Sequence, residues 1–436
     1  MSGTISPTWI AVSIFLTTYI ALGLERIPRV LAAGVGVIFL LLFKVLTVEE
    51  AVAYVHWGTM GLLFGMFILI AVLSEAGFFS ALALAVAHQV RGEPRRLLMI
   101  FPLLTGLLAA FMDSITVMLF FATLTAELGR RLRFDPVPIV VAEVVAANIG
   151  GAATLMGDPP NVILGLVLRF GLIDFIMHTG PIALIGLIAA VAISYWQSVR
   201  RLRISSPPEA VELPSPAEMI RDPVLLRLGL LALALAVVLL STHHWVEHHL
   251  GIPLTAPLAT LIPAILLLLL GGSRVEGILR RIDYEVLLFL ICLFAIVGAL
   301  EKTHAIEAMT RAASSALGHH GLGLVSGLLW LSAFCSAVVD NVPFALSMAY
   351  ALQHLAASVG APPLSLMTWA VSLGTDLGGN FTPIGASANV VACAALEGHG
   401  FQVGWGRWMR LAARPTMIAL GLAQMGLLIK AWLGFF

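Results

Sequence analysis

Five acidic residues lie within long apolar segments of the chain. They are Asp113, Glu143, Asp158, Asp340 and Asp376. A charged side chain at the centre of a bilayer costs about 2.5–3.5 kcal/mol on insertion scales, so residues of this kind usually serve a function. Burial disfavours the ionised form of a carboxyl group, which allows proton exchange near neutral pH. We therefore predict that these residues bind protons or cations.

Hydroxyl and amide side chains accompany these acids. The ten candidates for binding a small solute are Ser114, Thr116, Asn148, Thr154, Asn161, Asn341, Asn380, Thr382, Ser387 and Asn389. Hydroxyl and amide groups both donate and accept hydrogen bonds, which suits a hydroxylated solute. The sequence places no arginine or lysine near them, whereas a dianion or a tricarboxylate would require a cationic clamp. The pattern favours a metalloid hydroxide, or a cation held by carboxylates.

The sequence gives little sign of metal chemistry. Cys292, Cys335 and Cys393 lie in apolar runs and form neither a disulfide framework nor a Cys-x-x-Cys pair. Cys393 could contact a metalloid, although packing is the commoner role of such a residue. A loop expected at 243–249 carries four histidines, which suit either a metal or pH site or a hydrated loop. We predict no cofactor and no resident metal.

The composition indicates a membrane protein. Of the 436 residues, 60% are hydrophobic and 11% are charged, and the mean hydropathy is +1.00. Soluble domains carry about 45–50% apolar and about 25% charged residues. The 24 basic and 24 acidic residues cancel, so the net charge attracts no nucleic acid. These values exclude a soluble enzyme, a disordered scaffold and a nucleic-acid-binding protein.

Several segments are long enough to enter the bilayer, since a crossing helix needs about 20 mostly apolar residues. The clear candidates are 8–24, 28–46, 57–74, 179–199, 223–241, 252–271, 284–300 and 411–433. Segments 136–170 and 363–398 are apolar but broken in the middle by Gly, Pro, Asn and Asp. Segments 97–131 and 321–358 carry polar turns at their centres, which predicts re-entrant hairpins.

The basic residues indicate the topology. With two hairpins and ten crossings, nineteen of the 24 basic residues fall on one face, which the positive-inside rule makes cytoplasmic. Both termini are then outside, the first hairpin opens to the cytoplasm, and the second opens to the outside. We predict an inner-membrane protein with halves at 1–203 and 223–436, joined by a cytoplasmic linker at 204–222.

The two halves repeat each other. One offset in the numbering carries Asp113 onto Asp340, and an offset longer by a single position aligns Gly150–Asn161 with Gly378–Asn389. The second alignment preserves glycines, a threonine and the final asparagine. Because the halves have opposite orientations in the predicted topology, the repeat is inverted. Inverted repeats with broken helices are typical of secondary transporters, and the breaks point to the substrate site.

The repeat bears on the roles of the acids. Asp113 and Asp340 are equivalent and could cap the helices that follow them by accepting backbone N–H bonds. They could also bind a proton or a cation. Asp158 has no acidic counterpart, because Ala386 takes its place, and this asymmetry favours function over capping.

The break motifs resemble a known family. Segments 147–161 (ANIGGAATLMGDPPN), 379–390 (GNFTPIGASANV) and 61–66 (GLLFGM) are similar to the ArsB, NhaD and P-protein branch of the ion transporter superfamily. The resemblance implies an all-α polytopic fold like that of citrate transporters, a homodimer, and a transport domain that moves as an elevator against a scaffold. It also allows a soluble ATPase subunit as a partner. The Ser-Asn-Thr tips of the sodium-coupled dicarboxylate branch are missing here.

These observations predict proton-coupled efflux of arsenite or antimonite, with a small inorganic solute and protons as the species moved. A sodium/proton antiporter that uses Asp113, Asp158 and Asp340 as cation ligands is the alternative. An organic-anion carrier of the citrate type is a third reading, disfavoured by the missing clamp. An enzyme would need a nucleophile–base pair or a metal triad near one interface, and the sequence offers none.

Overall fold

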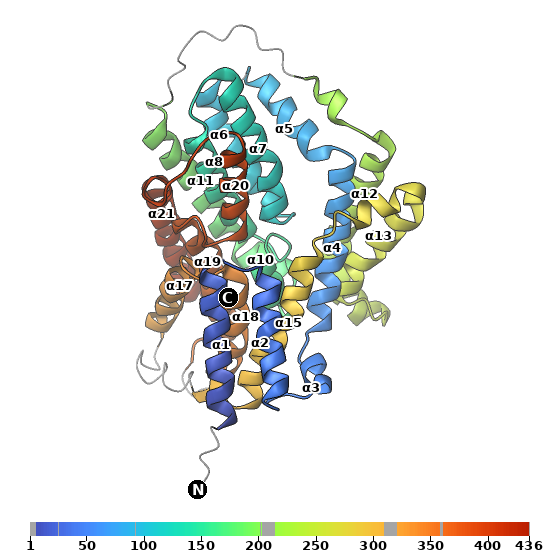
Figure 1. The fold of residues 1–436 in the computed structure, drawn as a ribbon, viewed down its shortest axis with the longest axis vertical. Helices are drawn as coiled ribbons and strands as arrows, with labels where there is room; N and C mark the ends of the chain where they lie inside the picture. The colour runs from blue at the N-terminus through green and yellow to red at the C-terminus, as the bar shows by residue number, and fades with distance from the viewer. Residues whose placement is uncertain are drawn as a thin grey trace.

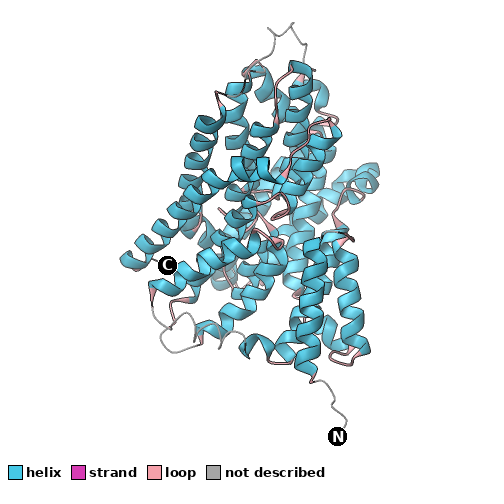
Figure 2. Ribbon diagram, turned by 60° about the vertical axis from the view of Figure 1, so that its left-hand side comes forward, coloured by secondary structure: helices cyan, strands magenta, loops and turns pink. Residues whose placement is uncertain are grey.

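The computed structural model describes residues 6–24, 26–91, 93–200, 202, 214–308, 321–357 and 361–435. In these ranges the regular structure is entirely helical (Figures 1 and 2). Residues 204–213 of the expected linker lie outside them. The described end of the linker contains one short 3₁₀ helix, η1 (Pro216–Met219).

The first half contains eleven described helices. They are α1 (Pro7–Leu24), α2 (Arg29–Leu42), α3 (Val48–Ala53), α4 (Trp57–Glu75), α5 (Phe78–Gln89), α6 (Pro94–Ala109), α7 (Ser114–Leu132), α8 (Val137–Gly151), α9 (Pro159–Leu168), α10 (Leu172–His178) and α11 (Gly180–Ser198). The polar turn of segment 97–131 separates α6 from α7. The Gly- and Pro-containing break of segment 136–170 separates α8 from α9.

The second half follows the same plan. Its described helices are α12 (Pro223–Leu250), α13 (Ala256–Gly271), η2 (Gly272–Arg274), α14 (Val275–Leu279), α15 (Tyr284–Lys302), α17 (Leu322–Ser336), α18 (Asn341–Ala356), α19 (Leu364–Gly378), η3 (Gly379–Phe381), α20 (Ser387–Gly398) and α21 (Trp405–Leu433). The offset that carries Asp113 onto Asp340 also carries both ends of α4 onto those of α15, and both ends of α8 onto those of α19. The sequence repeat is therefore also a repeat of helix boundaries.

Glycine permits the close packing of the broken helices. A Cβ atom at Gly150 would lie 1.9 Å from the carbonyl oxygen of Gly106, where α8 crosses α6. At the equivalent place in the second half, a Cβ at Gly378 would lie 2.3 Å from the carbonyl oxygen of Ala333, where α19 crosses α17. Only glycine, which has no Cβ, allows backbones to approach this closely.

Six of the described helices are long and apolar enough to cross a membrane: α1, α4, α11, α12, α15 and α21. The pair α9 and α10 passes the same test jointly but is bent by 112°. Helices α12 and α13 expose large apolar side chains such as Leu231 and Leu269, which suits contact with lipid. The expected ten crossings would also have to include shorter helices.

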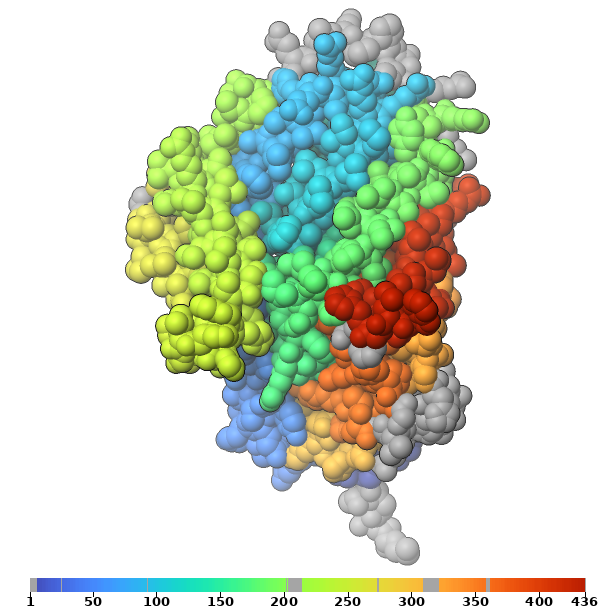
Figure 3. Space-filling view, turned by 180° about the vertical axis from the view of Figure 1, so that it is seen from behind, coloured from blue at the N-terminus to red at the C-terminus, as the bar shows by residue number. Residues whose placement is uncertain are grey.

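Helix pairs from the two halves build the molecule. Helix α2 packs on α15 and α13 packs on α4, which are equivalent pairs in the repeat. Helices α1, α2 and α3 occupy the lower end in Figure 1, and α5, α6 and α7 occupy the upper end. On the face shown in Figure 3, α11 and α21 lie side by side, in agreement with their contacts.

The expected histidine loop at 243–249 is wrong, because α12 continues as a helix through Leu250. A hydrophobic run followed by histidines offers no helix-breaking residue before Gly251, where the backbone turns left-handed. His243 is buried, and its Nδ1 lies 2.7 Å from the carbonyl oxygen of Leu240. Among the described residues, no group of three or more His, Cys, Asp or Glu side chains is placed to hold a metal ion.

Candidate functional site

Each break is fastened to the hairpin tip of its own half by a threonine. The hydroxyl of Thr154 donates to the carbonyl oxygen of Ala110 at the first tip. The hydroxyl of Thr382 donates to the carbonyl oxygen of Ala337 at the second tip, at 2.5 Å. Both threonines were predicted as solute ligands. They donate instead to the carbonyl oxygens of the residues directly after α6 and α17, and such carbonyls at a helix end have no partner within the helix.

Two equivalent asparagines hold the breaks in shape. Asn161 Nδ2 donates to the carbonyl oxygens of Gly151 and Thr154, at 2.9 and 3.3 Å. Asn389 Nδ2 donates to the carbonyl oxygens of Gly379 and Thr382, at 2.8 and 2.7 Å. Both asparagines are fully buried, so their amides replace the water that the unwound backbone would otherwise bind.

The remaining amide of the first break crosses to the second half. Asn148 Nδ2 donates to the Oδ1 atoms of Asn380 and Asn389, at 2.9 and 3.0 Å. In return, the Ser372 hydroxyl of α19 donates to Asn161 Oδ1 at 2.7 Å. The two breaks therefore meet through side-chain amides in the interior.

At the first tip, Asp113 caps α7. Its carboxylate accepts bonds from the backbone N–H and the hydroxyl of Thr116, at 2.9 and 2.7 Å. The next residue, Ser114, donates its hydroxyl to Asp158 Oδ1 at 2.5 Å. Asp158 stands at the start of α9 but makes no capping bond there. The first tip and the first break are thus linked through an acid that does not serve as a cap.

At the second tip, Asp340 both caps α18 and binds an arginine. Asp340 Oδ1 accepts the backbone N–H of Val342 at 3.0 Å, and Oδ2 lies 2.7 Å from Arg29 Nη1. The same Nη1 atom donates to the Ser387 hydroxyl at 2.5 Å, and that hydroxyl lies 3.2 Å from Asp340 Oδ2. The prediction that no basic residue lies near a tip or a break is therefore wrong. Arg29 comes from the start of α2, far away in the sequence.

A cavity of about 540 Å³ lies beside this arginine. The first turns of four helices contribute to its wall, through Ile115 of α7, Pro159 of α9, Val342 of α18 and Ser387 of α20. Arg29 of α2 completes that side of the wall, so both repeats and the α1–α2 connection meet here. Helix N-termini attract negative charge, because their first backbone N–H groups have no partner in the helix.

Acids also line this cavity. Asp283 and Glu285 at the start of α15 are in its wall together with Asp340. Asp283 is engaged as a cap, since it accepts the backbone N–H of Val286 at 3.1 Å. An adjoining cavity of about 270 Å³ reaches Asp113 and Arg281, and Arg281 pairs with Glu75. The site therefore contains both signs of charge.

The other predicted residues lie apart from the cavity wall. Glu143 is buried between α6, α7 and α8 and accepts the Thr125 hydroxyl at 2.6 Å. Asn341 is buried at the start of α18. Cys393 packs half-buried against the core on α20, outside the lining of the cavity. Asp376 is fully buried on α19.

Three residues that the sequence did not single out support the site. Arg29 is one of the nineteen basic residues that the predicted topology places on the cytoplasmic face, although Pro28 and an apolar run directly adjoin it. Ser372 precedes Asp376 by one helical turn, and that spacing was the available signal. Trp408 of α21 donates its indole N–H to the carbonyl oxygen of Asn380, at 3.0 Å. No local sequence pattern predicts this contact.

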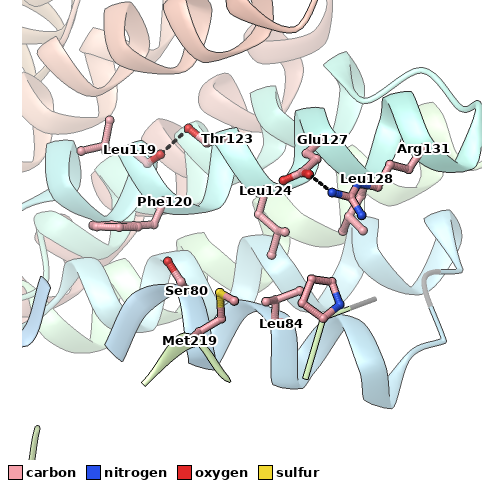
Figure 4. A pocket seen from close by; sticks show the side chains of 11 residues that line it. Ser80, Leu84, Leu119, Phe120, Thr123, Leu124, Glu127, Leu128, Arg131 and Met219 are labelled. Carbon is pink, nitrogen blue, oxygen red and sulfur yellow. Dashed lines mark hydrogen bonds and ion pairs between the residues drawn. The ribbon is translucent and has the colours of Figure 1, made fainter. Parts of the chain in front are cut away.

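A separate cavity of about 500 Å³ lies between α5, α7 and the described end of the linker (Figure 4). Leu84, Leu124 and Met219 give it an apolar wall, with the Glu127–Arg131 ion pair at one end. It contains none of the break or tip residues, so it is distinct from the site at Arg29.

A family model described as "Citrate transporter" matches residues 19–374. The chain belongs to this family. An uncharacterised transporter of Mycobacterium tuberculosis is 32% identical over 98% of this chain and 98% of its own length. The human P protein is 29% identical over 96% of this chain and 59% of its own length. This member of the citrate transporter family is therefore a multi-pass membrane transporter with P-protein homologues.

Solved structures show the same fold. The YdaH transporter of Alcanivorax borkumensis aligns over 98% of this chain and 99% of its own, with a TM-score of 0.59 at 13% identity. MtrF of Neisseria gonorrhoeae, described as one of a class of antimetabolite efflux pumps, aligns over 98% and 95% with a TM-score of 0.54. At 13% identity, these similarities concern the fold alone.

Proposed function

We propose that this protein is a proton-coupled secondary active transporter of a small carboxylate-bearing anion. The observation that supports this most is the position of Arg29, whose guanidinium lies at the second tip beside a cavity that four helix starts also line. A guanidinium binds carboxylates through paired N–H groups, and helix N-termini add favourable dipoles. Membership of the citrate transporter family agrees with such a substrate.

The position of Arg29 changes the order of the three candidate functions. The prediction of arsenite or antimonite efflux rests on the family resemblance and on the absence of a cationic clamp near the tips and breaks, and Arg29 removes the second of these grounds. In the proposed mechanism, a substrate carboxylate takes the place of Asp340 on Arg29, and protons neutralise the acids that line the cavity. The arginine then distinguishes an anion from a neutral hydroxide.

A sodium/proton antiporter is the second candidate, because Asp283, Glu285 and Asp340 all face the same cavity. Three carboxylates against Arg26 and Arg29 give the wall a net charge of −1, which attracts cations. This candidate needs Asp340 to leave Arg29 and ligate the ion directly.

The motion that we propose is an elevator movement in a homodimer embedded in the inner membrane. The hairpins α6–α7 and α17–α18, with the broken helices, would form the moving domain. Helices α1, α2, α4, α12, α13 and α15 would form the scaffold. Packing of α2 on α15 and of α4 on α13 supports the scaffold assignment, and Arg29 then lies on the scaffold side of the cavity. The inverted orientation of the halves is part of the same proposal.

The test is a solute panel in inside-out vesicles from a host that lacks metalloid and sodium exporters. Citrate, succinate, arsenite, antimonite and sodium are each added, and dissipation of the proton gradient is followed by a pH-sensitive dye. We expect citrate or succinate to dissipate the gradient. A response to arsenite and antimonite alone would refute the carboxylate proposal and restore metalloid efflux, and a response to sodium alone would establish the antiporter.

A further inference from the structure

Two buried acids, Asp158 and Asp376, have no acidic counterpart in the other half of the repeat, and both belong to the region of the two breaks. In the alignment of the two break motifs, Asp158 corresponds to Ala386, and Asp376 corresponds to Asn148. The backbone is the same at the first of these pairs: Asp158 has φ −143° and ψ 149°, and Ala386 has φ −147° and ψ 149°. The fold therefore needs no carboxyl group at either position, because the equivalent position in the other half carries an alanine or an asparagine.

Asn161 connects the two acids. Ser372 of α19 donates to Asn161 Oδ1, and Asp376 is one turn further along α19, about 6 Å away on the same face. Asp376 lies beside the Asn161 amide and within electrostatic range of Asp158. Asp158 Oδ2 in turn adjoins Gly151, whose carbonyl oxygen accepts a bond from Asn161. Asp376 therefore lies beside Asn161, and Asp158 lies beside the glycine to which Asn161 donates.

Three of the four carboxyl oxygens of this pair are buried without a hydrogen-bond partner among the described residues. Within the described chain, neither oxygen of Asp376 nor Oδ2 of Asp158 meets a donor. Asp376 is 0% exposed and Asp158 is 2% exposed. A buried carboxylate with no donor and no counter-ion is strongly unfavourable, so the pair requires a proton or a cation. Asn148, which is equivalent to Asp376 in the first half, donates its amide hydrogens to Asn380 and Asn389.

Capping does not account for the pair. Asp158 makes no capping bond to α9 and accepts the Ser114 hydroxyl from the first tip instead. Asp376 lies within the last turn of α19, where a negative charge opposes the helix dipole. The other charged groups that act on Asp158 are Asp113 and Asp340, one at each tip.

We propose that Asp158 and Asp376 form a buried site for one monovalent cation, and that this cation is the coupling ion. The ion is a proton or Na⁺, since either one reduces the charge of this buried carboxyl pair from −2 to −1. The coupling role of this cation rests on the proposed function, whereas the binding of the cation at this site does not. Through Ser114 and Asn161, the bound cation fixes the first tip and the first break in one arrangement, and its departure leaves two like charges that repel each other.

Two variants test the site with little risk of misfolding. Asp376→Asn introduces the amide already present at Asn148, and Asp158→Ala introduces the methyl group of Ala386. Glu276→Gln is the control, because Glu276 pairs with Arg280 at the surface, where both side chains are 77% exposed. Monodispersity on gel filtration verifies that each variant is folded.

The first readout is the infrared band of protonated carboxyl groups, recorded on purified protein in sodium-free buffer near neutral pH. We expect wild type and the Glu276 variant to show a component that the Asp376 variant loses. If Na⁺ added to wild type removes that component, the site takes Na⁺; if Na⁺ has no effect, the site takes a proton. A band that is the same in wild type and in both site variants, with or without Na⁺, overturns the proposal.

The second readout separates this proposal from the proposed function. In proteoliposomes, both site variants are expected to lose citrate accumulation driven by an ion gradient while keeping citrate-for-citrate exchange. Gradient-driven accumulation retained in both variants would overturn the coupling site and leave the proposed function standing. Absence of citrate transport in wild type, together with the expected infrared result, would overturn the proposed function and leave the cation site standing.

Discussion

Replacing Arg29 tests how the site distinguishes anions. Arg29→Gln keeps a polar side chain of similar length but removes the charge that lies 2.7 Å from Asp340. Arg29 is 27% exposed and Asp340 is 7% exposed, so their contact is largely shielded from solvent. A hydrogen bond to a charged group contributes about 1.5–3 kcal/mol. With about 1.4 kcal/mol per factor of ten, loss of that bond raises the KM for a carboxylate by about 10- to 150-fold.

The assay is initial-rate uptake of labelled citrate into proteoliposomes, with Arg280→Gln as the matched control. Arg280 pairs only at the surface with Glu276, so its loss should leave KM unchanged. Because Arg29→Gln also leaves Asp340 without its cation, folded yield should fall as well. The double variant Arg29→Gln, Asp340→Asn should recover the yield without recovering KM. A KM in Arg29→Gln within about twofold of wild type, at undiminished yield, would refute the role of Arg29.

Two further predictions concern the scaffold of the site. Gly150→Ala places a Cβ atom 1.9 Å from the Gly106 carbonyl oxygen, so the yield of folded protein on gel filtration should collapse. Gly421→Ala is the control, because its Cβ would meet nothing within 4 Å and the yield should not change. A normal yield for both variants would show that α6 and α8 can separate. The hydrogen bond from Lys302 lowers the pKa of Glu50 below its ordinary 4.5. This ion pair therefore stabilises the fold at neutral pH, and the stabilisation is lost as the pH falls through the lowered pKa of Glu50. Glu50→Gln should therefore lower the melting temperature more at pH 7 than at pH 3, and an equal decrease at both would contradict the assignment.

Much of the fold follows from patterns that are local in the sequence. Apolar length, central breaks and an offset between the halves that varies by only one position predict where α4, α8, α15 and α19 lie. The polar turns predict where α7 and α18 begin, because an acid followed by a helical segment is a capping signal. Short elements such as α5 were not anticipated, since a mostly apolar segment of twelve residues is too short to satisfy a span criterion.

The composition of the site was harder to predict. Asp113 and Asp340 do cap their helices, so the structural interpretation of these acids is confirmed as at least one of their roles. Thr154 and Thr382 bind backbone carbonyls, which sequence alone could not distinguish from binding a solute. Arg29 was missed for a physical reason: its contact with Asp340 depends on how α2, near the start of the chain, meets the second tip in the other half.

The comparison of the two halves proved more informative than any single motif. Asp158 departs from the repeat in the sequence itself, because Ala386 occupies the equivalent position. The equivalence of Asp376 with Asn148 was equally present in the sequence, but its meaning depends on the absence of a donor around Asp376 within the described part of the chain. Departures from an internal repeat thus mark candidate functional residues, and burial then decides among them.

The most direct test of the central claim is simultaneous measurement of citrate and proton movement in proteoliposomes that contain the wild-type protein. An imposed pH gradient should drive labelled citrate to accumulate against its own gradient, and a protonophore should abolish the accumulation. Citrate imposed alone should in turn move protons, in a fixed ratio to citrate. Citrate movement that is indifferent to the pH gradient, or an absence of citrate movement while arsenite or sodium moves protons, would contradict a proton-coupled carboxylate transporter.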